Sequence, residues 1–185
     1  MADTVAVMNN GVIEQMGAPT ELYESPNTAF VANFLGQSNL FPAAVVEVAE
    51  DQLIMEDSDG KFRMPLTRVA DGVPTARGTR VLVGVRPEKI HLAPIQEADP
   101  PPSDGNFVDG LVETTSFLGV STQYEVRTAG GDIINVFAQN LDVHGLQTVG
   151  TRVRLSWQPM HGFVLDGSEN INAGVETVSG KVVTG

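Results

Sequence analysis

Residues 81–92 read Val81-Leu82-Val83-Gly84-Val85-Arg86-Pro87-Glu88-Lys89-Ile90-His91-Leu92, and this pattern is typical of a buried strand that ends at a fixed corner. Apolar side chains fill the stretch up to Val85, which predicts a strand in the protein core. Pro87 lacks a backbone N–H group and has a fixed φ, so the strand is expected to end there. Arg86 precedes the proline and is therefore expected in an extended conformation.

The corner itself carries a cation and an anion. In an extended chain Arg86 and Glu88 project to the same side, which brings the two charges close together. One interpretation is a solvated strand end, whose ion pair stabilises the fold by at most about 1 kcal/mol. The other is an interface or barrel-organising contact, in which the guanidinium is a directional donor. Arg86, Pro87 and Glu88 are therefore the candidate interface or structural motif.

Composition excludes several classes of function. The 185 residues carry a net charge of −12, which disfavours nucleic acids and anionic membrane surfaces as partners. The chain has no cysteine, so thiol catalysis, thiolate metal sites and disulfides are excluded. No apolar run is long enough to span a bilayer, and the N-terminus does not resemble a signal peptide. We therefore expect a cytoplasmic protein that does not insert into a membrane.

From residue 39 onward the sequence is typical of a small β-barrel. Many short strands alternate with Gly, Asp and Pro, and the clearest alternation covers Val120–Val126 and Val153–Trp157. The phase of Trp157 favours a core position over stacking on a ligand. A Pro-rich loop over 97–106 separates two halves. We expect one mainly β, OB-like barrel domain over residues 39–166.

The two ends of the chain differ from this barrel. Residues 4–16 predict a hairpin around an Asn-Gly turn, and two short helices follow before residue 36. Such a segment buries too little apolar surface to fold alone, so residues 1–38 are interpreted as the end of another domain. Residues 167–185 show little alternation and are expected to form a mobile tail.

No stretch predicts a catalytic, cofactor or metal site. Residues 174–182 contain Gly, Ser, Gly and Lys, but the spacing of a phosphate-binding loop is absent. Asp57 and Asp59 precede Gly60, where a turn is favoured over a calcium loop because Met55 and Leu66 occupy ligand positions of that loop. The histidines stand without partners at metal-ligand spacing. The sequence therefore predicts no enzyme.

Residues 2–26, ending in Gly17-Ala18-Pro19-Thr20-Glu21-Leu22-Tyr23-Glu24-Ser25-Pro26, resemble the last strands and helix of the nucleotide-binding domain in ABC importer ATPases. Residues 30–36 resemble the passage into the C-terminal extension of that family. Gly84-Val85-Arg86-Pro87-Glu88 resembles the G-x-R-P-E signature of this extension, a TOBE or MOP-like domain. The resemblance indicates the polyamine, iron or sugar importer subclass, with the spermidine/putrescine type preferred.

The resemblance implies a regulatory and dimerisation module rather than an ATPase. The family's Walker A motif, signature motif, Walker B aspartate and switch histidine would all precede Met1, and none is present, so this chain is not expected to hydrolyse ATP. Implied partners are a second copy, bound through the barrel or the hairpin edge, and, for the full-length parent, membrane permease subunits. The parent would lie peripherally on the inner face of the cell membrane. The alternative function is a small-ligand sensor for a polyamine or an oxyanion.

Overall fold

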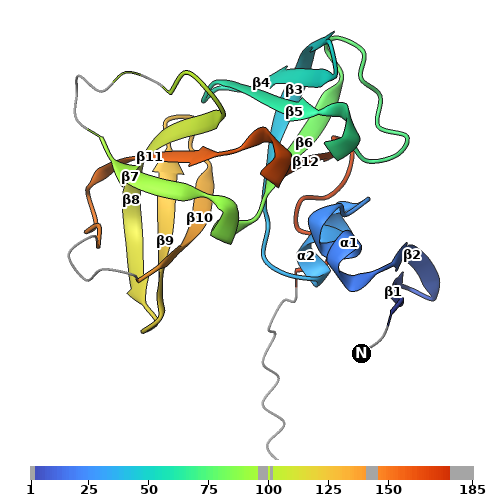
Figure 1. Cartoon of the computed structure of the whole chain (residues 1–185), viewed down its shortest axis with the longest axis horizontal. Helices are drawn as coiled ribbons and strands as arrows, with labels where there is room; N and C mark the ends of the chain where they lie inside the picture. The colour runs from blue at the N-terminus through green and yellow to red at the C-terminus, as the bar shows by residue number, and fades with distance from the viewer. Residues whose placement is uncertain (1–2, 96–99, 101, 141–145, 176–185) are drawn as a thin grey trace, which may run out of the picture.

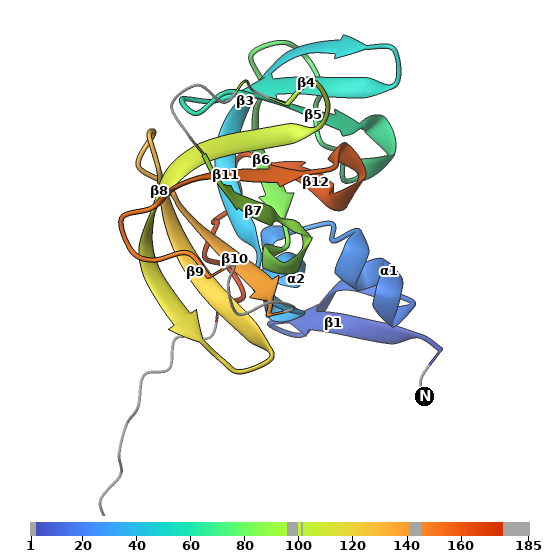
Figure 2. The same ribbon diagram turned by 60° about the vertical axis from the view of Figure 1, so that its left-hand side comes forward.

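The computed structural model describes residues 3–95, 100, 102–140 and 146–175 (Figure 1). Two curled five-stranded sheets form the main body, and a two-stranded hairpin with two short helices lies beside one of them (Figure 2). The fold class predicted from the sequence is therefore confirmed: a mainly β, OB-like structure preceded by a hairpin and two helices.

The elements follow one another in two similar series after the first helices. In chain order they are β1 (Val5–Asn9), β2 (Val12–Gly17), α1 (Pro19–Glu24), α2 (Ala29–Phe34), β3 (Asn39–Ala49), β4 (Gln52–Glu56), β5 (Lys61–Pro65), the 3-10 helix η1 (Leu66–Arg68), β6 (Arg80–Val85), η2 (Pro87–Lys89), β7 (His91–Pro94), β8 (Asn106–Phe117), β9 (Ser121–Thr128), β10 (Ile133–Gln139), β11 (Arg152–Trp157), η4 (Pro159–His161) and β12 (Gly162–Asp166).

The two large sheets have the same strand order and exchange their last strand. One sheet runs β12-β6-β3-β4-β5 and the other β7-β11-β8-β9-β10. Strand β7 follows the first half of the barrel in sequence but pairs with β11, where Leu92 lies opposite Leu155. Strand β12 ends the second half and pairs with β6, where Val164 lies opposite Val83. Each half thus completes the sheet of the other.

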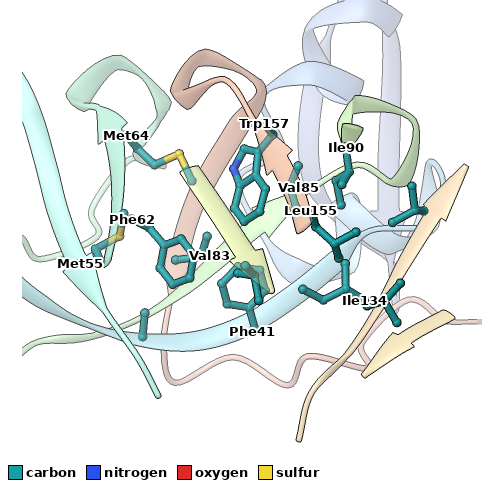
Figure 3. Close-up of a cluster of buried hydrophobic side chains, with 14 of the residues drawn as sticks. Phe41, Met55, Phe62, Met64, Val83, Val85, Ile90, Ile134, Leu155 and Trp157 are labelled. Atoms are coloured by element: carbon teal, nitrogen blue, oxygen red, sulfur yellow. The ribbon is translucent and has the colours of Figure 1, made fainter. Parts of the chain in front are cut away.

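One continuous core lies between the sheets and takes side chains from both. Phe41, Phe62 and Trp157 form its aromatic centre, with Phe62 and Trp157 stacked at a centroid distance of 5.8 Å (Figure 3). Trp157 is buried, as its phase in the sequence predicted. Aromatic side chains of this size bury a large apolar area, so the centre of the core depends on residues from both halves.

Two buried asparagines fasten each sheet to the edge of the other. The side chain of Asn39 donates to the carbonyl of Asn135 at 2.8 Å and accepts from its N–H group at 2.7 Å. The side chain of Asn106 makes the same pair of bonds with Arg63, at 3.0 and 2.8 Å. Each amide therefore replaces a strand at an otherwise unpaired edge, where open donors and acceptors would favour aggregation.

The hairpin and helices pack on the outer side of the β6/β12 sheet. Ala29 and Ala32 of α2 contact a buried cluster that includes Leu82, Phe163 and Leu165. Asn10 and Gly11 have positive φ values of 49° and 83°, which confirms the predicted Asn-Gly turn. Thr28 accepts a hydrogen bond from the N–H group of Val31 at 3.2 Å and so caps α2. The domain division at residue 38 stays a prediction.

The segment after β12 returns to α2. The Glu169 carboxylate accepts from the N–H group of Ala29 at 2.6 Å, and the Asn33 side chain donates to the carbonyls of Ile171 and Ala173 at 2.9 and 2.8 Å. Of the expected mobile tail, residues 167–175 thus carry specific contacts, and 176–185 lie outside the described residues. Within the described part of the chain, no helix combines the length and hydropathy required to cross a bilayer.

The exchanged strands predict that the two halves stay together when the loop between them is cut. We expect the products of a protease site inserted after Pro100 to co-elute in size-exclusion chromatography without denaturant. The reason is that the β7–β11 and β12–β6 pairings and the shared core all join one half to the other. An uncut sample is the control, and elution of the two fragments as separate species would contradict the prediction.

Candidate functional site

The predicted corner at the end of β6 is present, and its cation is buried. Arg86 has φ −74° and ψ 140°, the extended conformation expected before a proline, and Pro87 begins η2. The Arg86 side chain is only 2% exposed, although it carries a permanent charge. The interpretation of a solvated strand end is therefore wrong for this residue. Its role as an interface residue stays a prediction.

The guanidinium of Arg86 binds the C-terminal ends of both helices. Nη1 donates to the carbonyl oxygens of Ala32 at 2.6 Å and Gly36 at 2.9 Å and to the Ser38 hydroxyl at 2.7 Å, while Nη2 donates to the carbonyl of Tyr23 at 2.8 Å. Carbonyl groups at a helix C-terminus lack partners within the helix and carry partial negative charge. One cation therefore satisfies the ends of α1 and α2 together.

Tyr23 lies between the two charges of the predicted motif. Its ring stacks on Arg86, with the guanidinium carbon 4.1 Å from the ring centroid. Its hydroxyl donates to Glu88 Oε1 at 2.6 Å. The ion pairs of the described residues do not include Arg86 with Glu88, so the two side chains act through Tyr23. Next to them, Lys89 pairs with Glu24 at 3.1 Å.

Electrostatics follow from this arrangement. Burial lowers the pKa of the Arg86 guanidinium, and the nearby Tyr23, Glu88 and Glu24 act in the opposite direction. Burial, the hydrogen bond to Glu88 and the charge of that carboxylate raise the pKa of Tyr23 to about 12. Both groups thus keep at neutral pH the protonation state that their contacts require.

Arg68 forms a second clamp that sequence reasoning missed. Its Nε donates to the Gly162 carbonyl at 2.8 Å, Nη1 donates to the Ser25 hydroxyl at 2.9 Å, and Nη2 donates to the Glu24 carbonyl. It therefore joins the end of α1 to the start of β12. The acceptors are mostly main-chain carbonyls, which leave no residue-type signal that could have identified this partner set.

The first half and the second half contain the same corner but different side chains. Gln158 follows β11 as Arg86 follows β6, and its φ of −72° and ψ of 141° match those of Arg86 closely. Pro159 then begins η4 as Pro87 begins η2. Gln158 is exposed, however. The proline sets the backbone turn in both halves, and only the first half adds a buried cation to it.

A cavity of about 540 Å³ lies next to this corner. It is lined by Glu88, Lys89, Ile90, His91, Leu92, Tyr124, Phe137, Ala138, Gln139, Asn140 and Leu146. Tyr124 accepts a hydrogen bond from the N–H group of Gln147 at 3.2 Å, which fixes its hydroxyl at the wall of the cavity. Glu88 is the residue that the cavity shares with the Arg86 corner.

The Asp57–Gly60 stretch is the predicted turn. Asp57 Oδ1 accepts from the N–H groups of Asp59 and Gly60 at 2.7 and 3.0 Å. Asp59 also accepts from the N–H group of Gly130 at 2.7 Å, which connects turns of the two sheets. Asp132 brings a third carboxylate, with one oxygen of each aspartate within 4.8 Å of the others. Burial is the main cause that raises the pKa of Asp57.

Comparison with known proteins agrees with the sequence motifs. The family model of the TOBE domain matches residues 83–165, which include the Arg86 corner and both halves of the barrel. Residues 83–165 are a TOBE domain.

Curated relatives extend the match to most of the chain. The chain is 38% identical over 167 residues to the spermidine/putrescine import ATP-binding protein PotA of Acidothermus cellulolyticus, covering 89% of this chain and 41% of the relative. It is 39% identical over 165 residues to the putrescine transport ATP-binding protein PotG of Escherichia coli, covering 85% and 41%. The chain thus spans about two fifths of the length of these relatives. The resemblance of the TOBE chain to the C-terminal part of polyamine-type ABC importer ATPases is confirmed.

A solved structure supports the fold. A molybdate-bound crystal structure of the cytoplasmic molybdate-binding protein ModG matches with a TM-score of 0.58 at 18% identity, covering 68% of this chain and 94% of that protein. At this identity the likeness concerns the barrel architecture alone.

Removing the Arg86 cation should destabilise the TOBE chain strongly. Arg86→Met leaves several main-chain carbonyls without donors, and we expect the free energy of unfolding to fall by about 3–5 kcal/mol. Denaturant titration followed by fluorescence of Trp157 measures this change. Arg77→Met, at an exposed arginine, is the matched control and should change stability by less than about 0.5 kcal/mol. Equal effects of the two substitutions would contradict the joint.

Tyr23 should add a pH dependence at high pH. Its pKa in the folded chain, about 12, lies above the ordinary 10.0, so folding favours the neutral phenol. The stabilisation is therefore fully present below pH 10 and is lost as the pH rises to about 12. Tyr23→Phe keeps the ring but removes the titrating group. The stability difference between the native chain and this variant should shrink across that window, and a constant difference would exclude the contribution.

Proposed function

We propose that this chain is the non-catalytic regulatory and dimerisation part of the ATPase subunit of a polyamine ABC importer. In this assignment residues 1–38 are the end of the nucleotide-binding domain and residues 39–166 are the TOBE barrel. The observation that carries the proposal is the Arg86 joint, because one buried cation bonds the helices of the first segment to the barrel. The similarity to polyamine import ATP-binding proteins supports the choice of importer class.

The joint gives the barrel a mechanical connection to the segment before it. A displacement of α1 or α2 relative to β6 would separate the Arg86 guanidinium from carbonyls of both helices and leave a buried charge incompletely paired. That loss is costly, so the helices and the barrel move as one unit. A signal received by the barrel would therefore reach the ATPase domain through α1 and α2.

The proposal includes the partners and the location. The full-length protein would bind membrane permease subunits from the cytoplasmic side, and two copies would associate through the barrel or the hairpin edge. The outward side chains of the hairpin are apolar at Met8, Val12, Ile13 and Met16, all exposed, and so offer a surface for another part of the assembly. The net charge of −12 disfavours nucleic acid as a partner.

Uptake by the full-length protein tests the regulatory assignment. The protein and its permease would be reconstituted, and radiolabelled putrescine uptake and ATP hydrolysis measured for the native protein, Arg86→Gln and the control Arg77→Gln. We expect Arg86→Gln to lower transport per ATP hydrolysed several-fold while hydrolysis itself continues. An unchanged ratio of transport to hydrolysis in this variant would reject the coupling role. Phosphate release from MgATP by the 185-residue chain alone would reject the non-catalytic assignment.

A second candidate function is a small-ligand sensor, and the cavity beside Glu88 favours it. An acidic chain with a carboxylate and two aromatic residues at one cavity suits a cationic amine better than an oxyanion. Calorimetric titration with spermidine, molybdate and sulfate distinguishes these ligands. Glu88→Gln should weaken spermidine binding at least tenfold, whereas the exposed Glu56→Gln should leave it unchanged. Absence of heat from all three compounds would remove the sensor function.

A further inference from the structure

The turn between β8 and β9 exposes the apolar side chains of the second half. Residues 117–120, called here the β8–β9 tip, contain Phe117, Leu118 and Val120, which are 62%, 61% and 86% exposed. The tip lies at the far end of two long paired strands and projects beyond the rest of its sheet (Figures 1 and 2). Three large apolar side chains within four residues form a patch that water solvates poorly.

The tip has a defined shape. Gly119 has a positive φ of 85°, and the N–H group of Leu118 bonds to the Ser121 carbonyl at 2.9 Å. The Asn140 side chain donates to the Gly119 carbonyl at 2.7 Å and accepts from the Thr122 hydroxyl at 2.7 Å. The turn is therefore fixed from both sides before any partner binds, which lowers the entropic cost of association.

The fold itself does not require apolar residues at this position. The equivalent turn of the first half joins β3 to β4 and carries Glu50 and Asp51, with Glu50 at a positive φ of 57°. A polar, acidic turn thus completes the same hairpin in the same strand order. The exposed apolar residues of the β8–β9 tip need an explanation outside the folding of the barrel.

Charge selects the occupant of the tip. The chain carries 23 acidic and 11 basic residues, so two copies repel each other over most faces. From Thr114 to Tyr124 the sequence contains no charged residue, which makes this hairpin end a place where two copies can approach without that repulsion. A cationic partner would instead be drawn to the acidic faces.

We propose that the β8–β9 tip is the contact surface for a second copy of this chain, with the tips of the two copies packed against each other about a two-fold axis. In such an isologous contact a short patch is used twice, and a residue near the axis lies close to its own counterpart. The inference rests on the proposed dimerisation and names the surface that produces it. A patch of this size gives a weak, concentration-dependent dimer.

Cross-linking tests the surface directly because the chain contains no native cysteine. Val120→Cys treated with a short bismaleimide should form a covalent dimer at high micromolar concentration. Met160→Cys is the matched control, since Met160 is a 56% exposed apolar residue on η4, away from the tip. Cross-linking of the Met160 variant as fast as the Val120 variant would overturn the assignment.

Sedimentation separates failure of the surface from failure of dimerisation. We expect the native chain to self-associate and Val120→Asp to raise the dissociation constant at least tenfold, with Met160→Asp unchanged and circular dichroism spectra alike. Self-association that persists unchanged in Val120→Asp would overturn the tip as the interface but leave the proposed dimerisation intact. A native chain that stays monomeric at high micromolar concentration would overturn both.

Discussion

The desolvated guanidinium of Arg86 is the contact on which the union of the first segment and the barrel depends. Removing a cation from water is unfavourable unless its hydrogen bonds and charge are compensated. Compensation comes from the carbonyl ends of two helices, a hydroxyl and the face of Tyr23. Because neither helix alone supplies all the acceptors, α1, α2 and β6 can hold the charge only together. Short helices that would be marginal in isolation thereby gain a fixed position.

The barrel relies on a different constraint, the exchange of strands between its halves. Strands β7 and β12 each leave the half in which they are encoded and complete the other sheet. Asn39 and Asn106 then close the remaining edges with side-chain amides in place of a strand. Neither half presents a complete sheet or a complete core by itself, so the barrel folds as one unit. The Arg86 corner lies between β6 and the exchanged β7, which ties the joint to this exchange.

Local patterns in the sequence predicted most of the fold and little of the site. Alternation located the strands, the phase of Trp157 placed it in the core, and Asn10-Gly11 marked the hairpin. The exchange of β7 and β12 has no local signal, because alternation does not specify which strand is the neighbour. Tyr23 and Arg68 escaped prediction since their contacts join segments distant in sequence and use main-chain acceptors. Asp132 joined the Asp57 turn for the same reason.

The internal similarity of the two halves separates what the fold requires from what was added to it. Arg86 and Gln158 occupy the same backbone conformation before Pro87 and Pro159, so the proline is sufficient for the corner. The buried arginine occurs only in the half against which the helices pack, which assigns it to the joint and not to the barrel. The acidic β3–β4 turn and the apolar β8–β9 tip differ in the same way. Positions at which equivalent elements diverge in chemistry while their backbone agrees are therefore those where contacts outside the barrel act on the sequence.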